Sequence, residues 1–272
     1  MKSLLYIPAI AIAIASCNSQ KSGDPIATDS ISATDSITVG DSRASVSIAG
    51  QYPSSHDMLA DSMRLWIATT INHTASYTSE DITTLSPAMI ADGQKLIDTC
   101  ADSLMTQARR DFIDLQDNGF NTTYEYDVTF GISYTTPTVI TCYCTSYGYQ
   151  GGAHGGTTAL SASFRRSDGL MLDYDNTFTP QGIAELIDIL REEIWTQYFE
   201  PDCPDCDMTD VLLINPLELE LPSALPHFGP DGITFTYQQY EIAPYAAGMP
   251  SCTIPYDTLR PLMHPDIATL TE

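Results

Sequence analysis

Alternation of apolar and polar side chains predicts several β-strands in this chain. It is clearest between Tyr124 and Tyr134, where every second position is apolar until Pro137 ends the pattern. Shorter patterns of the same kind predict further strands over residues 44–52, 138–147, 157–166, 233–239 and 251–256, and Asp168-Gly169 predicts a turn into a short segment, Leu170–Asp173.

Apolar residues at helical spacing predict helices over residues 56–73 and 88–117, the second ending at Asn118-Gly119. Thr179-Pro180 supplies a capping hydroxyl followed by proline, so a third helix is predicted to begin there. Residues 257–263 are predicted to form a short closing helix, and residues 200–230 a long loop. Strands and helices come in blocks, which favours an α+β fold with a mainly antiparallel sheet packed against several helices.

The first 17 residues have the pattern of a lipoprotein signal peptide. Lys2 precedes an apolar run, Leu4–Ala15, that is too short to span a bilayer. Small residues before Cys17 form a lipobox, so cleavage would leave Cys17 as a lipidated N-terminus. The alternative is an ordinary signal peptide with an incidental cysteine. Residues 18–42 are rich in Ser, Thr, Asp and Gly and are predicted to be a disordered tether.

Export and lipidation together predict a location in the bacterial cell envelope, on the periplasmic side or at the cell surface. The lipid anchor would be the chain's contact with the membrane, because no later stretch is apolar over the roughly 18 residues that a span requires. The formal net charge of −24 argues against binding to nucleic acid or to anionic lipid surfaces. It suits a cationic partner, although a solvated acidic surface is the commoner reason for such a charge.

Six cysteines follow Cys17, and an even number in an exported chain suggests disulfides. Cys203 and Cys206 are close enough for a local bridge; free thiols or a metal site are the alternatives. The pair alone is a weak zinc signal, because a structural zinc site needs four ligands. Cys142 and Cys144 are two apart in a predicted strand, so they share a face and are poorly placed to bond each other.

Residues 148–157, GYQGGAHGGT, contain five glycines, and four of them form the two pairs that flank His154 between two predicted strands. The segment lacks the ending of a phosphate-binding loop, and no helix is predicted to follow it. Glycines between strands usually supply positive φ and close backbone approach. A conformational role for His154, contact with a ligand, and catalysis or metal binding all stay open. The chain has neither Gly-x-Ser-x-Gly nor His-Glu-x-x-His, so no catalytic residue, metal site or cofactor is predicted.

Several segments of the C-terminal half occur in the order found in a known family. They are YQGGAHGG, Leu172-Asp173, Phe178-Thr179, GITFTYQQYEIAPYAAG and IPYDTL. Over about residues 124–265 the chain resembles the RsiV/PdaC C-terminal domain family, largely of unknown function. Residues 44–120 are similar to the companion N-terminal domain. The resemblance implies an N-terminal PdaC-like region over 43–122 and an RsiV C-terminal-like domain over 123–272.

The resemblance implies a binding module of the cell envelope rather than an enzyme, because no deacetylase segment is present. In that family the domain binds lysozyme or accompanies a peptidoglycan deacetylase, so a lysozyme-like protein or peptidoglycan is the expected partner. The candidate ligand-binding residues are His154, Gly152, Asp173, Tyr240, Glu241 and Tyr245. A hydrolase of envelope glycans that uses His154 with Asp173 or Glu241 is one alternative. A structural component of an envelope complex is the other.

Overall fold

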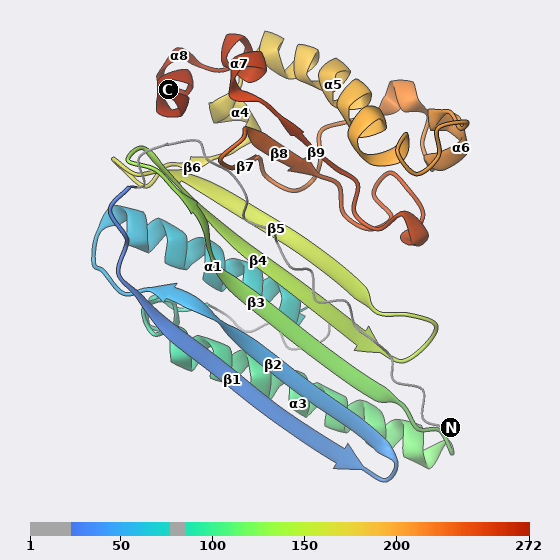
Figure 1. The fold of residues 1–272 in the computed structure, drawn as a ribbon. Coiled ribbons are helices and arrows are strands. Elements are labelled where there is room, and N and C mark those ends of the chain that lie inside the picture. The colour runs from blue at the N-terminus through green and yellow to red at the C-terminus, as the bar shows by residue number, and fades with distance from the viewer. Residues whose placement is uncertain (1–22, 77–84) are drawn as a thin grey trace.

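The computed structural model describes residues 23–76 and 85–272. A six-stranded sheet has the strand order β1-β2-β3-β4-β5-β6, and a second sheet has the order β7-β8-β9 (Figure 1). Helices pack against these sheets, which confirms the predicted α+β fold. Cys17 and the rest of the predicted signal peptide lie outside the described residues. Within the described ranges no helix is long and apolar enough to cross a membrane.

The large sheet is antiparallel except between β2 and β3, which run parallel with Arg43 opposite Thr123. The predicted division between residues 122 and 123 therefore falls between two neighbouring strands of one sheet. Its strands are β1 (Thr28–Val39), β2 (Ser42–Pro53), β3 (Thr123–Thr135), β4 (Val139–Gln150), β5 (Gly156–Arg165) and β6 (Met171–Leu172).

Three helices lie between β2 and β3 in the chain: α1 (Met58–Ser76), α2 (Pro87–Ala91) and α3 (Gly93–Asp117). They cover one face of the large sheet (Figure 1). The alternating side chains of β2 and β3 point into the core beneath them, where Ile48, Phe112 and Phe130 are almost completely buried. The single helix predicted over 88–117 is two helices, because the Asp92 carboxylate accepts the Lys95 N–H and starts α3 anew.

The disordered tether predicted for residues 18–42 is wrong for residues 28–39, which form β1. Their Ser, Thr and Asp content hid an alternation in which Ile31, Ala33 and Ile37 face the core. Pairing with β2 along the whole of β1 supplies the backbone hydrogen bonds, so a polar composition does not prevent a strand here.

The C-terminal part is built from short elements. They are α4 (Tyr174–Thr177), α5 (Pro180–Ile194) with a π-helical turn (Trp195–Phe199), α6 (Met208–Val211), β7 (His227–Phe228), β8 (Ile233–Thr236), β9 (Ser251–Ile254), α7 (Tyr256–Leu259), α8 (Pro265–Ala268), and 3₁₀ turns at Pro216–Glu218, Tyr245–Ala247, Arg260–Leu262 and Thr269–Thr271. Their shared core centres on Phe178, Phe235 and Tyr237. We call this part the C-terminal layer.

Buried hydroxyls join the C-terminal layer to the large sheet. Thr141 on β4 donates to the Phe228 carbonyl (2.9 Å), and Ser163 on β5 accepts from the Phe228 N–H (3.1 Å). The two hydroxyl oxygens lie 2.9 Å apart. The layer is therefore fixed near the start of β4 and the end of β5. The opposite end of this strand pair carries the connection formed by residues 151–155, which we call the glycine loop.

Candidate functional site

The glycine loop is the tight connection between β4 and β5. Gly151 and Gly152 have φ angles of 84° and 91°, which favour glycine over any residue with a side chain. A Cβ on Gly155 would lie 2.5 Å from the Tyr147 ring. The glycines therefore have the conformational role considered from the sequence, and they let the backbone next to His154 lie against an aromatic ring.

His154 belongs to a group of three rings, which we call the ring cluster: His154, Tyr240 and Tyr245. The His154 and Tyr245 rings are stacked, with centroids 3.7 Å apart and an angle of 18°. The Tyr240 ring centroid lies 5.8 Å from that of Tyr245, and its side chain is exposed. Both tyrosines are 86 or more positions from His154 in the chain. Three of the predicted ligand-binding residues thus come together at the surface.

Hydrogen bonds fix the tautomer of His154. Its Nδ1 lies 3.0 Å from the Gly155 carbonyl oxygen, which can only accept, so Nδ1 donates. Its Nε2 lies 3.3 Å from the Tyr240 hydroxyl, which donates to it when the imidazole is neutral. The contacts of His154 found among the described residues are therefore rings and a carbonyl, and none is the carboxylate that would orient a general base.

Two glutamines attach the segment that carries the tyrosines to the edge of β5. Gln238 accepts the Ala159 N–H (3.0 Å) and donates to the Ala159 carbonyl (2.8 Å). Gln239 accepts the Thr157 N–H (2.8 Å). These side chains make the hydrogen bonds that a neighbouring strand would make along the part of β5 with which β6 does not pair. Tyr240 follows with a φ of 65°, a strained value for a residue with a side chain, and this turn directs its ring toward His154.

Glu241 braces the same segment rather than facing a ligand. Its carboxylate accepts hydrogen bonds from the Ser223 N–H (2.7 Å), the Ser223 hydroxyl (3.0 Å) and the Gln238 N–H (2.6 Å). The donors engage both carboxylate oxygens, so Glu241 is held in place by its own segment and by Ser223.

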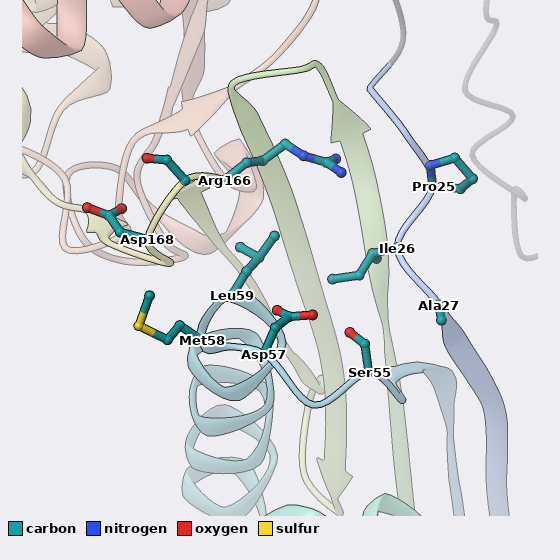
Figure 2. Close-up of a pocket in the computed structure, with 10 residues that line it drawn as sticks. Pro25, Ile26, Ala27, Ser55, Asp57, Met58, Leu59, Arg166 and Asp168 are labelled. Atoms are coloured by element: carbon teal, nitrogen blue, oxygen red, sulfur yellow. The ribbon is translucent and has the colours of Figure 1, made fainter.

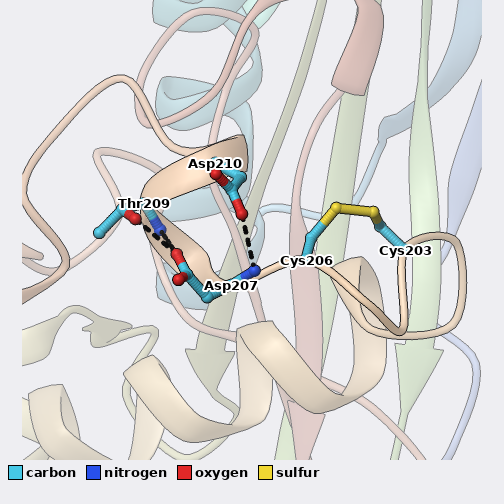
Figure 3. The surroundings of a disulfide bond; sticks show 5 residues. All are labelled: Cys203, Cys206, Asp207, Thr209 and Asp210. Carbon is cyan, nitrogen blue, oxygen red and sulfur yellow. Dashed lines mark hydrogen bonds between the residues drawn. A yellow bond between two sulfur atoms is a disulfide. The ribbon is translucent and has the colours of Figure 1, made fainter.

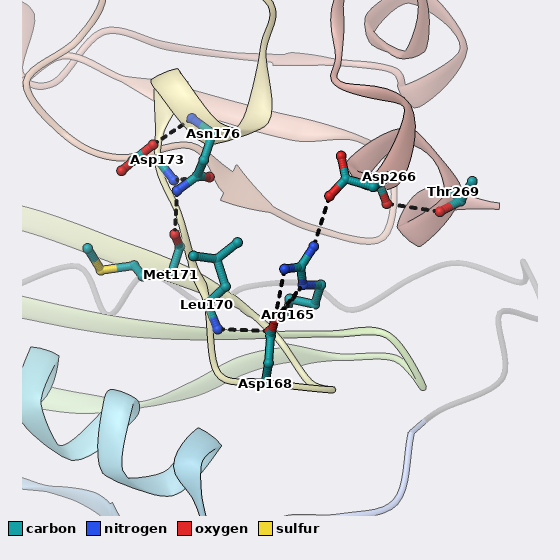
Figure 4. A network of polar contacts seen from close by, with 8 residues as sticks. All are labelled: Arg165, Asp168, Leu170, Met171, Asp173, Asn176, Asp266 and Thr269. Carbon is teal, nitrogen blue, oxygen red and sulfur yellow. Dashed lines mark hydrogen bonds and ion pairs between the residues drawn. The ribbon is translucent and has the colours of Figure 1, made fainter.

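Asp173 lies away from the ring cluster. It caps α4 by accepting the Asn176 N–H (2.8 Å), as Figure 4 shows. Its neighbour Leu172 pairs with Ser163, whereas His154 precedes Gly156 at the other end of β5. At about 3.3 Å per residue the two ends are roughly 23 Å apart along the strand. The hydrolase interpretation required His154 to meet Asp173 or Glu241, and neither carboxylate is arranged for that.

Two carboxylates that the sequence reasoning missed lie beside the ring cluster. Glu125 and Asp127 are exposed on β3, opposite Tyr149 and Tyr147 of β4, on the face that the helices leave open. Tyr147 lies opposite Asp127 on β3 and against Gly155, next to His154, so its ring connects the carboxylates with the ring cluster. Burial raises the pKa of Tyr147, and the nearby charges of Glu125 and Tyr245 raise it further. The alternation of β3 already implied that Glu125 and Asp127 share a face, but the register with β4 is needed to bring them to the glycine loop.

The six cysteines among residues 23–76 and 85–272 form one bridge and four thiols. Cys203 and Cys206 are joined in a disulfide with Cα atoms 5.4 Å apart, directly before the Asp207 cap of α6 (Figure 3). Further disulfides, which the even number of cysteines suggested, are not found among the described residues, where the other cysteines are free and buried: Cys100 on α3, Cys142 and Cys144 on β4, and Cys252 on β9. Burial raises the pKa of the Cys142 and Cys144 thiols to about 12, so neither is a thiolate at neutral pH.

A cavity of about 390 Å³ lies next to the end of β5, and the glycine loop lies next to its start. Figure 2 shows that its walls come from the segment before β1, the start of α1 and the turn after β5. Arg166 contributes to the wall, but its guanidinium already donates to the Thr135 hydroxyl and the Asp24 carbonyl. Nearby Arg165 is held by Asp168 and Asp266 (Figure 4). The cavity's charged groups are therefore mostly engaged with the protein itself.

The arrangement around the ring cluster supports binding better than chemistry. No group of three or more potential metal-ligating side chains is found among residues 23–76 and 85–272. What the site offers is exposed aromatic surface beside two exposed carboxylates. Such surfaces hold cationic groups or sugar rings without any bond being broken.

Comparison with known proteins places the C-terminal layer in a known domain type. Residues 175–257 match the family described as a protein of unknown function, DUF3298. Over these residues the chain is similar to the DUF3298 domain. The match includes Tyr240, Glu241 and Tyr245 and begins after His154 and Asp173. No curated protein matches this chain.

Two crystal structures share the fold of nearly the whole chain. A member of the DUF3298 family from Bacteroides fragilis has a TM-score of 0.66 at 19% identity, covering 92% of this chain and 99% of that one. A DUF3298 family protein from Pseudomonas aeruginosa has a TM-score of 0.61 at 18% identity, covering 90% and 97%. The sheet, its helices and the C-terminal layer therefore recur as one unit around the DUF3298 domain.

Proposed function

We propose that this protein is a non-enzymatic binding module of the bacterial cell envelope, anchored by lipid on Cys17. It binds a cationic protein of the lysozyme type at the ring cluster and the neighbouring carboxylates. The observation that supports this most directly is the ring cluster, in which His154 stacks on half-exposed Tyr245 beside exposed Tyr240, near the strand pairs that carry Glu125 and Asp127. Arginine and lysine side chains are attracted both to aromatic faces and to carboxylates.

The charge of the whole chain favours the same class of partner. A net charge of −24 raises the encounter rate with a basic protein and disfavours acidic ones. The resemblance to the RsiV/PdaC C-terminal domain family supports a lysozyme-like partner as well. Peptidoglycan is the second candidate, because tyrosine rings also stack on the apolar faces of sugars.

Calorimetric titration of the soluble domain with lysozyme and with purified muropeptides tests the proposal. We expect lysozyme to bind, and the double variant Glu125→Gln/Asp127→Asn to bind at least about tenfold more weakly, which corresponds to about 1.4 kcal/mol. The matched control Glu192→Gln/Glu220→Gln removes two charges from exposed positions elsewhere and should bind like the parent. Heat with muropeptides alone would select the second candidate, and no heat with either would overturn the proposal.

The anchor has its own test. Labelling cells with a palmitate analogue should mark the protein and place it in the membrane fraction. Cys17→Ser should remove both the label and the membrane association. An unlabelled parent protein would show that the N-terminal segment is an ordinary signal peptide.

A further inference from the structure

β1 and the ring cluster lie toward opposite edges of the large sheet. β1 is the terminal strand of that sheet, and no strand among residues 23–76 and 85–272 pairs with its outer edge (Figure 1). The strand pairs with β2 over all of Thr28–Val39 without a shift in register. A long, regular edge of this kind presents a row of backbone donors and acceptors that an added strand can use.

The hydrogen bonds identify which residues face outward. The Ser54 N–H donates to the Ala27 carbonyl, so odd-numbered residues of this segment direct their backbone groups toward β2. Even-numbered residues therefore direct theirs outward. The Ser36 N–H agrees with this, because it donates to the Asp35 carboxylate (2.7 Å). The Ser32 carbonyl agrees as well, because it accepts from the Gln94 side chain (3.0 Å).

The side chains of β1 repeat with a period of six. The sequence Ala-Thr-Asp-Ser-Ile occurs at residues 27–31 and again at residues 33–37. Six is an even number, so both copies present the same side chains to the same face. Ile31 and Ile37 are half-buried against the core, and Asp29 and Asp35 are exposed on that same side of the strand. Polar hydroxyls occupy the other face throughout.

Charge selects the occupant of this edge. Asp29, Asp35 and the α3 residue Asp98, which accepts from Gln94 (2.9 Å), make the edge acidic. A second copy of the chain would bring the same carboxylates and a net charge of −24 toward the edge, which disfavours self-pairing. An extended segment with basic residues opposite the aspartates and β-branched residues opposite the isoleucines fits the backbone edge, its charge and its apolar positions.

We propose that the outer edge of β1 accepts a basic extended segment of another protein as an added antiparallel strand. Backbone hydrogen bonds to the even-numbered residues supply the pairing, and on binding the Ser36 N–H and the Ser32 carbonyl exchange their side-chain partners, Asp35 and Gln94, for the added strand. The repeated aspartate and isoleucine positions supply the preference for alternating lysine or arginine and apolar residues on one face. This site is independent of the ring cluster and adds a second contact surface to the proposed function.

The peptide TVTKTVTVTKT is the probe, because in an antiparallel register it places its lysines opposite Asp35 and Asp29 and its valines opposite Ile37, Ala33 and Ile31. Fluorescence anisotropy with the full soluble domain should show saturable binding. The peptide TVTETVTVTET, with glutamates in place of the lysines, should bind at least about tenfold more weakly. Equal affinity for the two peptides would overturn the charge selection.

Peptide N-methylation tests the backbone pairing without changing the protein. A methyl group on the threonine after the first lysine removes the N–H that would face the edge at Thr34. One on the following valine removes an N–H that would face away. We expect the first to weaken binding about tenfold or more and the second to leave it within about twofold. Equal losses, or none, would rule out strand addition.

A matched pair of variants tests the protein side. Thr34→Pro removes an outward N–H while sparing the bonds to β2, and Thr34→Ala keeps that N–H. Only the proline variant should lose the lysine peptide. A mass measurement by light scattering accompanies the titration, because a parent protein that dimerises through this edge would show that the occupant is a second copy instead.

Discussion

The large sheet and the C-terminal layer form their cores from different kinds of element. Five strands of the sheet have ten or more residues each, and alternation along them buries one face under α1 and α3. In the C-terminal layer the strands have two to four residues. Its core combines aromatic side chains, among them Phe178 and Tyr237, with aliphatic side chains that come in part from α5. Regular pairing stabilises the first region, and side-chain caps and packing stabilise the second.

This difference explains where the candidate site lies. The ring cluster forms where the two regions meet. His154 lies at the end of the regular β4–β5 hairpin, and the two tyrosines lie on an irregular segment of the C-terminal layer. The hairpin supplies a rigid edge, and the irregular segment supplies a residue with positive φ, Tyr240. Neither region alone could hold His154 against Tyr245.

The largest predicted effect tests whether the two regions are one cooperative unit. Phe235→Ala in the C-terminal layer and Phe130→Ala in the large sheet should each lower the free energy of unfolding by about 3–5 kcal/mol, because both side chains are fully enclosed. Urea unfolding can be followed at Trp195 in a Trp66→Phe background and at Trp66 in a Trp195→Phe background, since each region holds one tryptophan.

We expect both tryptophan probes to report the same midpoint in each variant, because the buried hydroxyls of Thr141 and Ser163 couple the regions. A transition at Trp66 that Phe235→Ala leaves unchanged would show instead that the layer unfolds separately.

The junction between the regions gives the next largest effect. Ser163→Ala would leave the buried Phe228 N–H without its acceptor and remove the hydroxyl beside Thr141. We expect a loss of about 1–3 kcal/mol in the free energy of unfolding, measured with urea. Ser161→Ala is the control, because it makes the same change on the same strand at a half-exposed position. Equal stability of the two variants would show that the junction hydrogen bond contributes nothing.

The capping role of Asp173 predicts a smaller change. Asp173→Ala should lower the free energy of unfolding by about 1 kcal/mol, because the Asn176 N–H loses its acceptor at the start of α4. Asp175→Ala removes the same charge inside α4 and should cost less. In both variants lysozyme binding should be unchanged, and a loss of binding specific to Asp173→Ala would return this residue to the candidate site.

His227 predicts the smallest effect, a dependence of stability on pH. Burial between the regions lowers the pKa of His227 below its usual value of 6.5. The unfolded chain therefore takes up the proton first, so this contribution is complete above about pH 6.5 and is lost as the pH falls toward the lower folded value. The free energy of unfolding measured from pH 7 to pH 5 should fall less in His227→Gln than in the parent. Parallel pH profiles would contradict the prediction.

Regular periodicity made most of the large sheet predictable. The alternation over residues 124–134 located β3, and the helical stripes located α1 and α3, because each element buries one face against the same core. β1 was missed because composition was weighed above alternation: Ile31, Ala33 and Ile37 already had the spacing of a strand. The parallel pairing of β2 with β3 is set by packing and has no signature in either strand alone.

The candidate site was only partly predictable for a related reason. His154 was singled out by the glycines around it, and Tyr240 and Tyr245 through a resemblance, and the structure brings these three together. Asp173 and Glu241 were grouped with them, although their oxygens are used by local backbone N–H groups. A carboxylate that caps a turn and one that faces a ligand look alike in sequence, and only the positions of their donors distinguish them.

The parallel pairing of β2 with β3 also constrains how the chain can fold. Arg43 and Thr123 are neighbours in the sheet, yet three helices separate them in the chain. The β1–β2 hairpin can close from local contacts alone, but it must wait for β3 before the sheet continues. Closing so long a loop is slow, and until then β2 offers an unpaired edge of its own. That interval is when the folding chain is most exposed to aggregation and when a chaperone would have most to protect.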